Sequence, residues 1–325
     1  MLAGQITKPG KIELLDIDEP TLPDEQGHII FQPELTCLCG SDLPYFDGQL
    51  SNEPQQLGHS LHEMIGTVIE TNGSRFRAGE RVLAVPINQV GLFERFPLSE
   101  LRAIPLDPRP AEEHALMAQP FGTVLFALRK LPNLIDQNVV VIGQGPIGQM
   151  FNTALKNLGA RQIIGIDKLE SRLALSKQMG ATATICNAND DPAAIVSDLT
   201  GGRLADVVVE AVGHEHHQLD LCGKLVRHAG IVLSFGVPPR TSIEVNWNTL
   251  FRKNAVIYTS VDPDFTRDFP LAMKWISEER IDLRPLLTHR FPLSEIQTAY
   301  ETFRDKRDGA QKVLVEFPAL ASQRS

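Results

Sequence analysis

The sequence predicts an α/β protein whose first part is mostly β and whose second part is a doubly wound parallel sheet. Short β-like runs broken by Gly, Pro and Asn-Gly fill the first hundred residues. From Asn138 onward, solidly apolar short strands alternate with helical segments, which is typical of a parallel sheet covered on both faces. The chain has 325 residues, and single cores seldom grow beyond about 250–300 residues, so we expect two domains.

The first part yields three clear strands and one helical stretch. The strands are His28–Pro33, Glu63–Glu70 and Glu80–Pro86. A helical pattern follows from Ala111 to Lys130, with acidic residues at its start and basic residues at its end, as the helix dipole favours. Pro120 should interrupt or kink this helix.

The second part alternates strands and helices, and the tail adds one more helix and two strands. The predicted elements are Val139–Ile142, a helix to Leu158, Gln162–Asp167, a helix to Met179, Asp206–Glu210, Ile231–Phe235, a helix at Pro270–Glu279, Leu286–Phe291 and Lys312–Phe317. We expect the tail to return to the first domain.

Composition narrows the class of partner. The net charge of −9 disfavours nucleic acid and anionic membranes, because both attract basic surfaces, and it leaves a small molecule as the expected partner. Four cysteines at low density predict a reducing compartment without disulfides. We find no signal-peptide pattern and no apolar run of about 18 residues, so we expect a cytoplasmic protein.

A strand running into a glycine-rich turn and a helix predicts a dinucleotide site. In this turn Gly143 permits the tight bend, Gly145 lets a pyrophosphate approach the backbone, and Gly148 lets the helix pack on the strand. Pro146 and Ile147 open the helix whose N-terminus would receive the pyrophosphate. Alone, such a motif matches incidental turns about as often as true sites.

Asp167 strengthens the dinucleotide interpretation. It ends the next strand, close to the spacing of roughly 20 residues at which a carboxylate binds the adenosine ribose. A carboxylate there would repel a 2′-phosphate, so NAD is favoured over NADP. Lys168 and Arg172 weaken that preference, although each also fits an ordinary solvated position at a helix start.

A thiol, an imidazole and a carboxylate in the first part suggest a catalytic zinc. Cys39 precedes Gly-Ser-Asp, and His62 and Glu63 follow some twenty residues later, with His59 as a competing imidazole. Composition alone supports two interpretations of Cys39 equally. It is either a metal ligand or a small, buried apolar residue.

Taken together in order along the chain, the motifs resemble the medium-chain zinc-dependent alcohol dehydrogenase superfamily, especially its polyol and threonine dehydrogenase-like branch. They are Cys39-Gly-Ser-Asp42, His62-Glu-x-x-Gly-x-Val68, Gly79-Glu-Arg-Val-Leu83, Gly143-x-Gly-Pro-Ile-Gly148, Val208-Val-Glu-Ala-Val-Gly213 and Lys312-Val-Leu-Val315. The resemblance implies a GroES-like catalytic domain over 1–121, a Rossmann domain over 122–262, a returning segment over 263–325, and an active site between the domains. It also implies a homodimer or homotetramer.

The resemblance assigns the metal ligands residue by residue. Cys39 and His62 would bind one catalytic zinc, and Glu63 would be a ligand or an exchangeable neighbour of the metal. The family usually has a Cys, Asp or Glu as its third protein ligand, and the matching position in this chain is Gln119. The neutral amide of Gln119 binds zinc less strongly than a thiolate or a carboxylate does. The lobe that holds a structural zinc in many relatives has no cysteines in this chain, so we expect no structural zinc.

The resemblance also assigns the remaining site residues. Ser41 would accept the alcohol proton, and Asp42 would support a zinc-bound histidine, although Asp42 also fits an N-cap. The family's relay histidine is replaced by Pro44, so the proton must leave through water, the ribose, Tyr45 or His59. The residues implied to contact the cofactor are Thr123 and Phe235, Gly236 and Val237 at the nicotinamide and Lys312 at the pyrophosphate.

The expected reaction is reversible hydride transfer between an alcohol and NAD, with zinc stabilising the alkoxide. Few aromatic residues, together with His59, Tyr45 and Asp47, weakly favour a polyol, sugar or hydroxy-amino acid. Two alternatives remain. One is a zinc-free NAD(P)H reductase of enones or quinones, and the other is a non-catalytic dinucleotide sensor, which Gln119 and Pro44 make conceivable.

Overall fold

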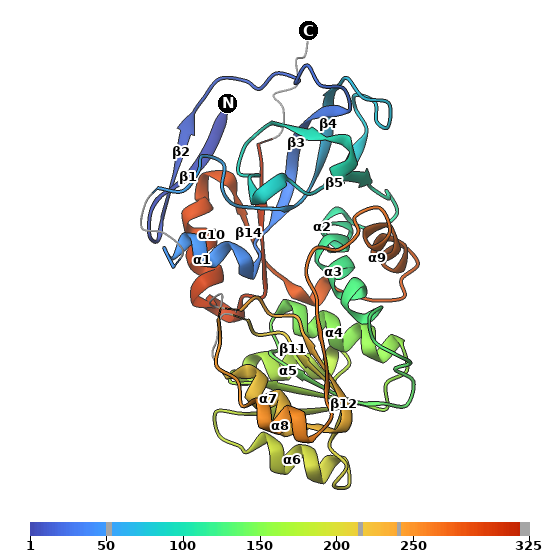
Figure 1. Ribbon diagram of the computed structural model, residues 1–325. Helices are drawn as coiled ribbons and strands as arrows, with labels where there is room; N and C mark the ends of the chain where they lie inside the picture. Colours follow the sequence, from blue (N-terminus) through green and yellow to red (C-terminus); the bar gives the residue numbers. More distant parts are fainter. Residues whose placement is uncertain (50–53, 214–216, 239–241, 319–325) are drawn as a thin grey trace. The chain divides into compact units, whose positions relative to one another are not determined.

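The computed structural model describes residues 1–49, 54–213, 217–238 and 242–318. The chain divides into two compact units. The first contains residues 1–120, 265–279 and those from 283 onward, and the second contains residues 121–264 and 280–282 (Figure 1). The predicted domain limits at 122 and 263 lie close to these divisions, and the tail contributes to the first unit.

The second unit is built on a six-stranded parallel sheet. Its strands run in the order β10-β9-β8-β11-β12-β13, which is the doubly wound dinucleotide-binding order in which two halves meet at β8 and β11. The strands are β8 (Asn138–Ile142), β9 (Gln162–Asp167), β10 (Ala183–Cys186), β11 (Ala205–Glu210), β12 (Val226–Ser234) and β13 (Val256–Thr259). The predicted α/β fold class is confirmed.

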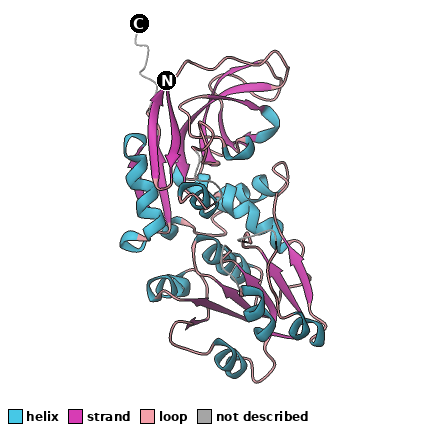
Figure 2. Cartoon of the chain, turned by 60° about the vertical axis from the view of Figure 1, so that its left-hand side comes forward, coloured by secondary structure: helices cyan, strands magenta, loops and turns pink. Residues whose placement is uncertain are grey.

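Helices cover both faces of this sheet (Figure 2). They are α4 (Pro146–Asn157), α5 (Glu170–Gln178), α6 (Pro192–Leu199), α7 (Gln218–Leu225) and α8 (Trp247–Arg252). All five residues of β8 are buried, as expected for a strand that contacts helices above and below.

The first unit is mostly β. A seven-stranded sheet follows the order β14-β15-β3-β4-β5-β7, with β6 paired to β3, and a separate hairpin joins β1 and β2. The strands are β1 (Leu2–Lys8), β2 (Lys11–Asp16), β3 (His28–Cys37), β4 (Glu63–Thr71), β5 (Arg81–Ala84), β6 (Phe96–Ser99), β7 (Ala103–Pro105), β14 (Leu287–Pro292) and β15 (Lys312–Glu316).

The third strand, β3, runs four residues beyond its predicted end. The prediction stopped it at Pro33, because proline cannot donate to a ladder. In the structure the pairing of β3 with β4 shifts register between Pro33 and Leu35 and then resumes as far as Cys37. This irregularity accommodates the proline and carries the strand to the site described below.

Short helices flank the sheet of the first unit. They are α1 (Leu43–Phe46), α2 (Glu112–Leu116), α9 (Asp268–Ser277) and α10 (Ile296–Asp305), while α3 (Ala118–Leu128) crosses the division between units. The predicted helical stretch is interrupted at Met117, ahead of Pro120. Pro120 therefore stands in the first turn of α3, where its missing N–H costs no helical hydrogen bond.

The core of the first unit joins its sheet to α10. Apolar side chains such as Phe31, Met64 and Val82 form one buried cluster with Ile296 and Tyr300 of that helix. In the described part of the chain, no helix is long and apolar enough to cross a membrane.

Candidate metal and dinucleotide sites

The pairing of β3 with β4 brings the predicted metal ligands together. Cys37, the last residue of β3, lies opposite Glu63, the first residue of β4. Cys39 stands two residues beyond the end of β3, and His62 immediately precedes β4. Residues distant in sequence therefore meet at one end of a single antiparallel strand pair.

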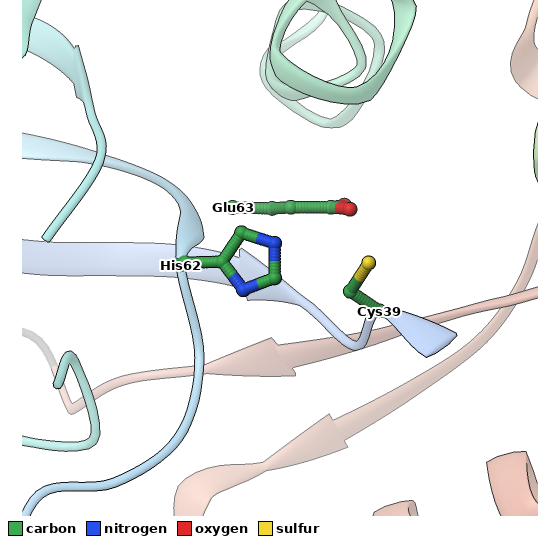
Figure 3. A group of neighbouring side chains, drawn as sticks. All are labelled: Cys39, His62 and Glu63. Atoms are coloured by element: carbon green, nitrogen blue, oxygen red, sulfur yellow. The ribbon is translucent and has the colours of Figure 1, made fainter. Parts of the chain in front are cut away.

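Cys39, His62 and Glu63 each direct one potential ligand atom into a common space. Their sulfur, ring nitrogen and carboxylate oxygen all lie within 4.8 Å of one another. Figure 3 shows one His62 ring nitrogen facing the Cys39 sulfur and the Glu63 carboxylate, and the other turned away. Thiolate, imidazole and carboxylate are the ligand types of catalytic zinc sites, so the residues present fit that ion.

Asp42 lies behind the imidazole. Its fully buried carboxylate accepts hydrogen bonds from the Cys39 N–H at 2.8 Å and the Leu61 N–H at 3.3 Å. The Nδ1 atom of His62 lies 3.6 Å from Asp42 Oδ1. Asp42 makes no side-chain cap hydrogen bond at the start of α1, but its bond with the Cys39 N–H is part of a capping box in the preceding turn. Its supporting role at the imidazole stays a prediction.

The electrostatics of this pair agree with its geometry. Burial alone would raise the pKa of Asp42, but the neighbouring His62 and the hydrogen bond from the Cys39 N–H outweigh burial and lower that pKa. Burial alone would lower the pKa of His62, whereas the Cys39 sulfur and Asp42 raise it. The imidazole therefore sits between the Cys39 sulfur and the Asp42 carboxylate, the arrangement expected of a metal ligand with a supporting carboxylate.

Glu63 has a buried cationic partner that sequence reasoning missed. The ammonium of Lys312, on β15, forms an ion pair with Glu63 and donates a hydrogen bond to the Leu38 carbonyl at 3.2 Å. Both side chains are almost fully buried. Strand β15 pairs with the end of β3, so the pairing of the C-terminal strand is what positions Lys312.

The structure thus gives Lys312 a different partner from the pyrophosphate that the resemblance implied. Burial alone would lower the pKa of Lys312, but the neighbouring Cys37 and Glu63 raise it. Burial raises the pKa of the Cys37 thiol well above its usual range, and Glu63 is the residue that forms the ion pair with the ammonium. To reach a pyrophosphate, Lys312 would have to leave this ion pair.

The remaining predicted residues of the first unit lie on nearby elements. Ser41 is partly buried in a short 3-10 turn, Gly40–Asp42, directly after Cys39. Gln119 is buried in the first turn of α3, and its role as a ligand stays a prediction. The rings of Tyr45 and His59 contact each other with centroids 4.0 Å apart.

His59 keeps an unpaired polar atom. Its side chain is buried, and among the described residues its Nδ1 has no hydrogen-bond partner. Burial lowers the pKa of His59, although Asp42 opposes this effect. A neutral imidazole with a free nitrogen can exchange a proton or a hydrogen bond with a bound molecule.

In the second unit, the glycine-rich turn has the conformation that its sequence predicts. Gly143 adopts φ +89°, which glycine tolerates best, and a side chain at Gly148 would collide with the Gly143 carbonyl. Gly145 precedes α4, and Pro146 and Ile147 begin this 12-residue helix. The helix therefore presents free N–H groups to an anion at the end of β8.

Asp167 ends β9 beside this turn. Its carboxylate accepts hydrogen bonds from the Gln144 N–H at 2.7 Å and the Leu169 N–H at 2.9 Å. The Arg172 guanidinium lies 3.7 Å from the same carboxylate. Two of the three residues predicted to influence the choice between NAD and NADP thus adjoin each other and the glycine turn.

The segment Phe235, Gly236 and Val237 follows β12. A buried carboxylate that sequence reasoning did not single out, Glu210, accepts hydrogen bonds from the N–H groups of Val212, Gly213 and Gly236. A buried acid at the end of an apolar strand was the signal available in the sequence. Val237 is half exposed, and Thr123 lies in α3.

The chain is similar to known zinc-binding dehydrogenases. The family described as zinc-binding dehydrogenase matches residues 146–278. L-Threonine 3-dehydrogenase of Bacillus subtilis is 27% identical, with 90% of this chain and 93% of the relative covered. The zinc-dependent alcohol dehydrogenase 2 of Streptococcus pneumoniae has a TM-score of 0.86 at 25% identity, covering 98% of this chain and 99% of that chain.

A second solved structure shows the same fold at lower identity. Alcohol dehydrogenase TADH from Thermus sp. ATN1 has a TM-score of 0.88 at 22% identity and covers 98% of this chain and 100% of that chain. Over nearly its whole length the chain is therefore similar to zinc-dependent dehydrogenases, and residues 146–278 match the zinc-binding dehydrogenase family.

The buried ion pair gives a first prediction. Lys312→Met leaves Glu63 as an uncompensated buried charge, so the free energy of unfolding should fall by about 3–5 kcal/mol. Chemical denaturation followed by circular dichroism measures this loss. Adding Glu63→Gln to the variant removes the orphaned charge and should restore much of the stability, whereas equal stability of wild type and Lys312→Met would contradict the pairing.

Proposed function

We propose that this protein is a zinc-dependent oxidoreductase that transfers a hydride between the carbinol carbon of an alcohol and NAD. The observation that carries the proposal is that a thiol, an imidazole and a carboxylate lie close together where β3 ends and β4 begins. The same chain also contains a parallel sheet with the strand order typical of dinucleotide-binding domains. The first unit would hold the alcohol, and the second would hold the dinucleotide. This reaction belongs to the class EC 1.1.1.-.

For the substrate, we propose a polyol, a sugar alcohol or a hydroxy-amino acid. Relatives of similar length act on such compounds, including L-threonine 3-dehydrogenase of Bacillus subtilis and, among solved structures, 2R,3R-butanediol dehydrogenase of the same organism. The polar groups of Tyr45, Asp47 and His59 suit a substrate that carries further hydroxyl groups.

Cys39 and His62 would hold one catalytic zinc ion, and Glu63 or Gln119 would complete the set. Once bound, the zinc supplies Lewis acidity that lowers the pKa of the alcohol. Because Lys312 already holds Glu63 by an ion pair, Glu63 would bind the metal only by sharing or leaving that partner. Gln119 is therefore the more available third ligand, although an amide binds more weakly than a carboxylate.

The proton of the alcohol would pass to Ser41, whose hydroxyl follows Cys39 by two residues. Pro44 cannot receive it, because proline has no titratable side chain. We propose that the next step involves the contacting pair Tyr45 and His59, since the buried imidazole Nδ1 has no hydrogen-bond partner in the part of the chain that the structure describes. From there the proton would leave through water.

We propose NAD as the preferred cofactor. The carboxylate of Asp167 would bind the adenosine ribose hydroxyls, and a 2′-phosphate would meet its negative charge. Arg172 reduces that repulsion, because its guanidinium lies 3.7 Å from the carboxylate.

We also propose that the protein forms a homodimer or homotetramer through the second unit. Strand β13 is an edge strand of the sheet, and the adjoining α8 exposes Trp247 and Phe251, which are 61% and 64% accessible. Val256 on β13 and Val261 shortly after it are also exposed. Open edges and apolar patches of this kind favour association of two copies.

A reducing, cytoplasmic setting suits this chemistry, because all four cysteines are free thiols and a zinc-binding thiolate must stay reduced. A disulfide involving Cys39 in protein isolated from cells would contradict this setting.

The metal site predicts the effect of one substitution. Cys39→Ser should lose zinc and nearly all turnover while retaining NAD affinity, because the dinucleotide turn is built from other residues. Elemental analysis, an NAD-reduction screen of polyols, sugars and alcohols, and calorimetric titration with NAD measure the three quantities.

Cys186→Ser, which changes a buried thiol of the second unit, is the matched control and should keep about one zinc per chain. Unchanged turnover in Cys39→Ser would overturn the metal mechanism and favour the zinc-free reductase. Bound zinc and NAD without turnover on any substrate in wild type would favour a sensor.

Cofactor choice is tested by Asp167→Asn. Removing the negative charge should raise the KM for NAD roughly tenfold and increase the activity with NADP relative to NAD. Steady-state kinetics with both cofactors give the ratio, and a thermal melt checks that the turn at Gln144 and Leu169 survives. An unchanged ratio would remove Asp167 from cofactor discrimination.

Association is tested by Trp247→Glu. A charge in the middle of the proposed contact should shift the protein toward monomers, because it would be buried without a partner. Sedimentation velocity of wild type and variant measures the change. A monomeric wild type, or an unaffected oligomer in the variant, would contradict this interface.

A further inference from the structure

A buried amide lies within the glycine-rich turn of the second unit. Gln144 stands between Gly143 and Gly145, and its side chain is fully buried. A side chain at Gly165 of β9 would lie only 2.8 Å from the amide carbon of Gln144, so the glycine leaves the space that the amide fills. A dinucleotide turn requires its glycines and not a buried amide between them. The amide therefore needs an explanation of its own.

Hydrogen bonds from the neighbouring elements hold this amide in place. Its nitrogen donates to the Val141 carbonyl at 2.9 Å. Its oxygen, Oε1, accepts a hydrogen bond from the Asn152 amide of α4 at 2.6 Å and lies 2.8 Å from the Ser176 hydroxyl of α5. Both of these partner side chains are also fully buried. Because a buried polar group is costly to leave unpaired, these contacts fix the position and the orientation of the amide.

Two chains of hydrogen bonds lead from Gln144 to the backbone of Arg172. The first passes through Ser176, whose hydroxyl lies 2.8 Å from Gln144 Oε1 and 2.9 Å from the Arg172 carbonyl. The second passes through the buried Gln149, whose Nε2 donates to the Gln144 carbonyl and to the Arg172 carbonyl, both at 3.0 Å. Both chains end in the first turn of α5, so Gln144 sets how this helix turn packs against the glycine turn.

Gln144 also contacts the acidic partner of Arg172. The Gln144 N–H donates a hydrogen bond to Asp167 Oδ2 at 2.7 Å, and the Arg172 guanidinium lies 3.7 Å from the same oxygen. A side chain at Gly145 would come within 3.6 Å of this guanidinium. One residue of the turn is therefore bonded to the acid directly and to the backbone of the base through Ser176 and Gln149.

We propose that Gln144 is a positioning residue that holds the Arg172 guanidinium beside Asp167, and so sets how strongly the site discriminates against a 2′-phosphate. This inference rests on the proposed dinucleotide site. A 2′-phosphate on the adenosine ribose would place a second negative charge beside the Asp167 carboxylate. A guanidinium held 3.7 Å from that carboxylate offsets part of the repulsion. If the first turn of α5 loosens, the guanidinium moves away and the repulsion grows.

The ratio of NADPH affinity to NADH affinity tests the proposal, measured on the full-length protein by fluorescence titration with each reduced dinucleotide. Gln144→Leu removes the amide and keeps a side chain of similar size. It should weaken NADPH binding about tenfold more than NADH binding, the effect of losing one charge-assisted contact. NADH should depend less on the amide, because the backbone hydrogen bonds to Asp167 remain. A general loss of packing would weaken both dinucleotides alike and leave the ratio unchanged.

The double variant Gln144→Leu/Arg172→Leu shows whether the glutamine acts through the arginine. Arg172→Leu alone should shift the ratio at least as far as Gln144→Leu, because it removes the charge itself. If Gln144 acts through Arg172, adding Gln144→Leu to Arg172→Leu changes the ratio no further. Ser176→Ala interrupts one of the two chains of hydrogen bonds and should shift the ratio in the same direction by a smaller factor.

Thr200→Val is the matched control. Thr200 is a buried residue of the same unit, directly after α6, and its hydroxyl donates to the Val196 carbonyl and accepts from the Leu204 N–H. The variant removes a buried hydroxyl whose contacts lie within and just after α6, so its ratio should stay that of wild type.

Four outcomes overturn the inference. They are an unchanged ratio in Gln144→Leu, a further change of the ratio in the double variant, an equal shift in Thr200→Val, and a wild type that binds NADH without measurable affinity for NADPH, because the guanidinium would then offset nothing. A wild-type protein that binds neither dinucleotide would instead refute the proposed function itself. If Gln144→Leu does not fold, an unchanged ratio in Ser176→Ala still refutes the inference.

Discussion

The antiparallel pairing of β3 with β4 is the constraint on which the candidate metal site depends. Cys37 lies opposite Glu63 across these strands, and this register alone decides that Cys39 and His62 meet. A slip of one residue would turn every side chain of β4 to the other face of the sheet. The buried apolar residues on both strands, including Phe31 and Met64, oppose such a slip because it would expose them to water.

Charge at this strand end is balanced by groups that come from far along the chain. Lys312 on β15 neutralises Glu63, and Tyr300 on α10 forms a hydrogen bond with Ser60, two residues before His62. Buried ions are tolerated only when they are paired and hydrogen-bonded. The C-terminal segment therefore stabilises the first unit in two ways. It neutralises the buried charge of Glu63, and its helix α10 packs into the apolar core.

Much of the architecture could be predicted from the sequence, because the parallel strands are continuous apolar runs and the glycine turn has a fixed chemistry. Strands such as β13 and helices such as α10 escaped prediction, since their burial patterns are set by tertiary packing and not by a clear period. Likewise, Cys39, His62 and Asp42 could be named from motifs. The Lys312–Glu63 and Tyr300–Ser60 contacts could not, because strand register and helix docking decide them.

X-ray absorption at the zinc edge tests the central claim most directly. The account predicts that the zinc-loaded protein has one sulfur neighbour at about 2.3 Å and at least one imidazole nitrogen at about 2.0–2.1 Å. A coordination sphere that contains only oxygen and nitrogen would contradict it, because Cys39 would then not be a ligand of the metal.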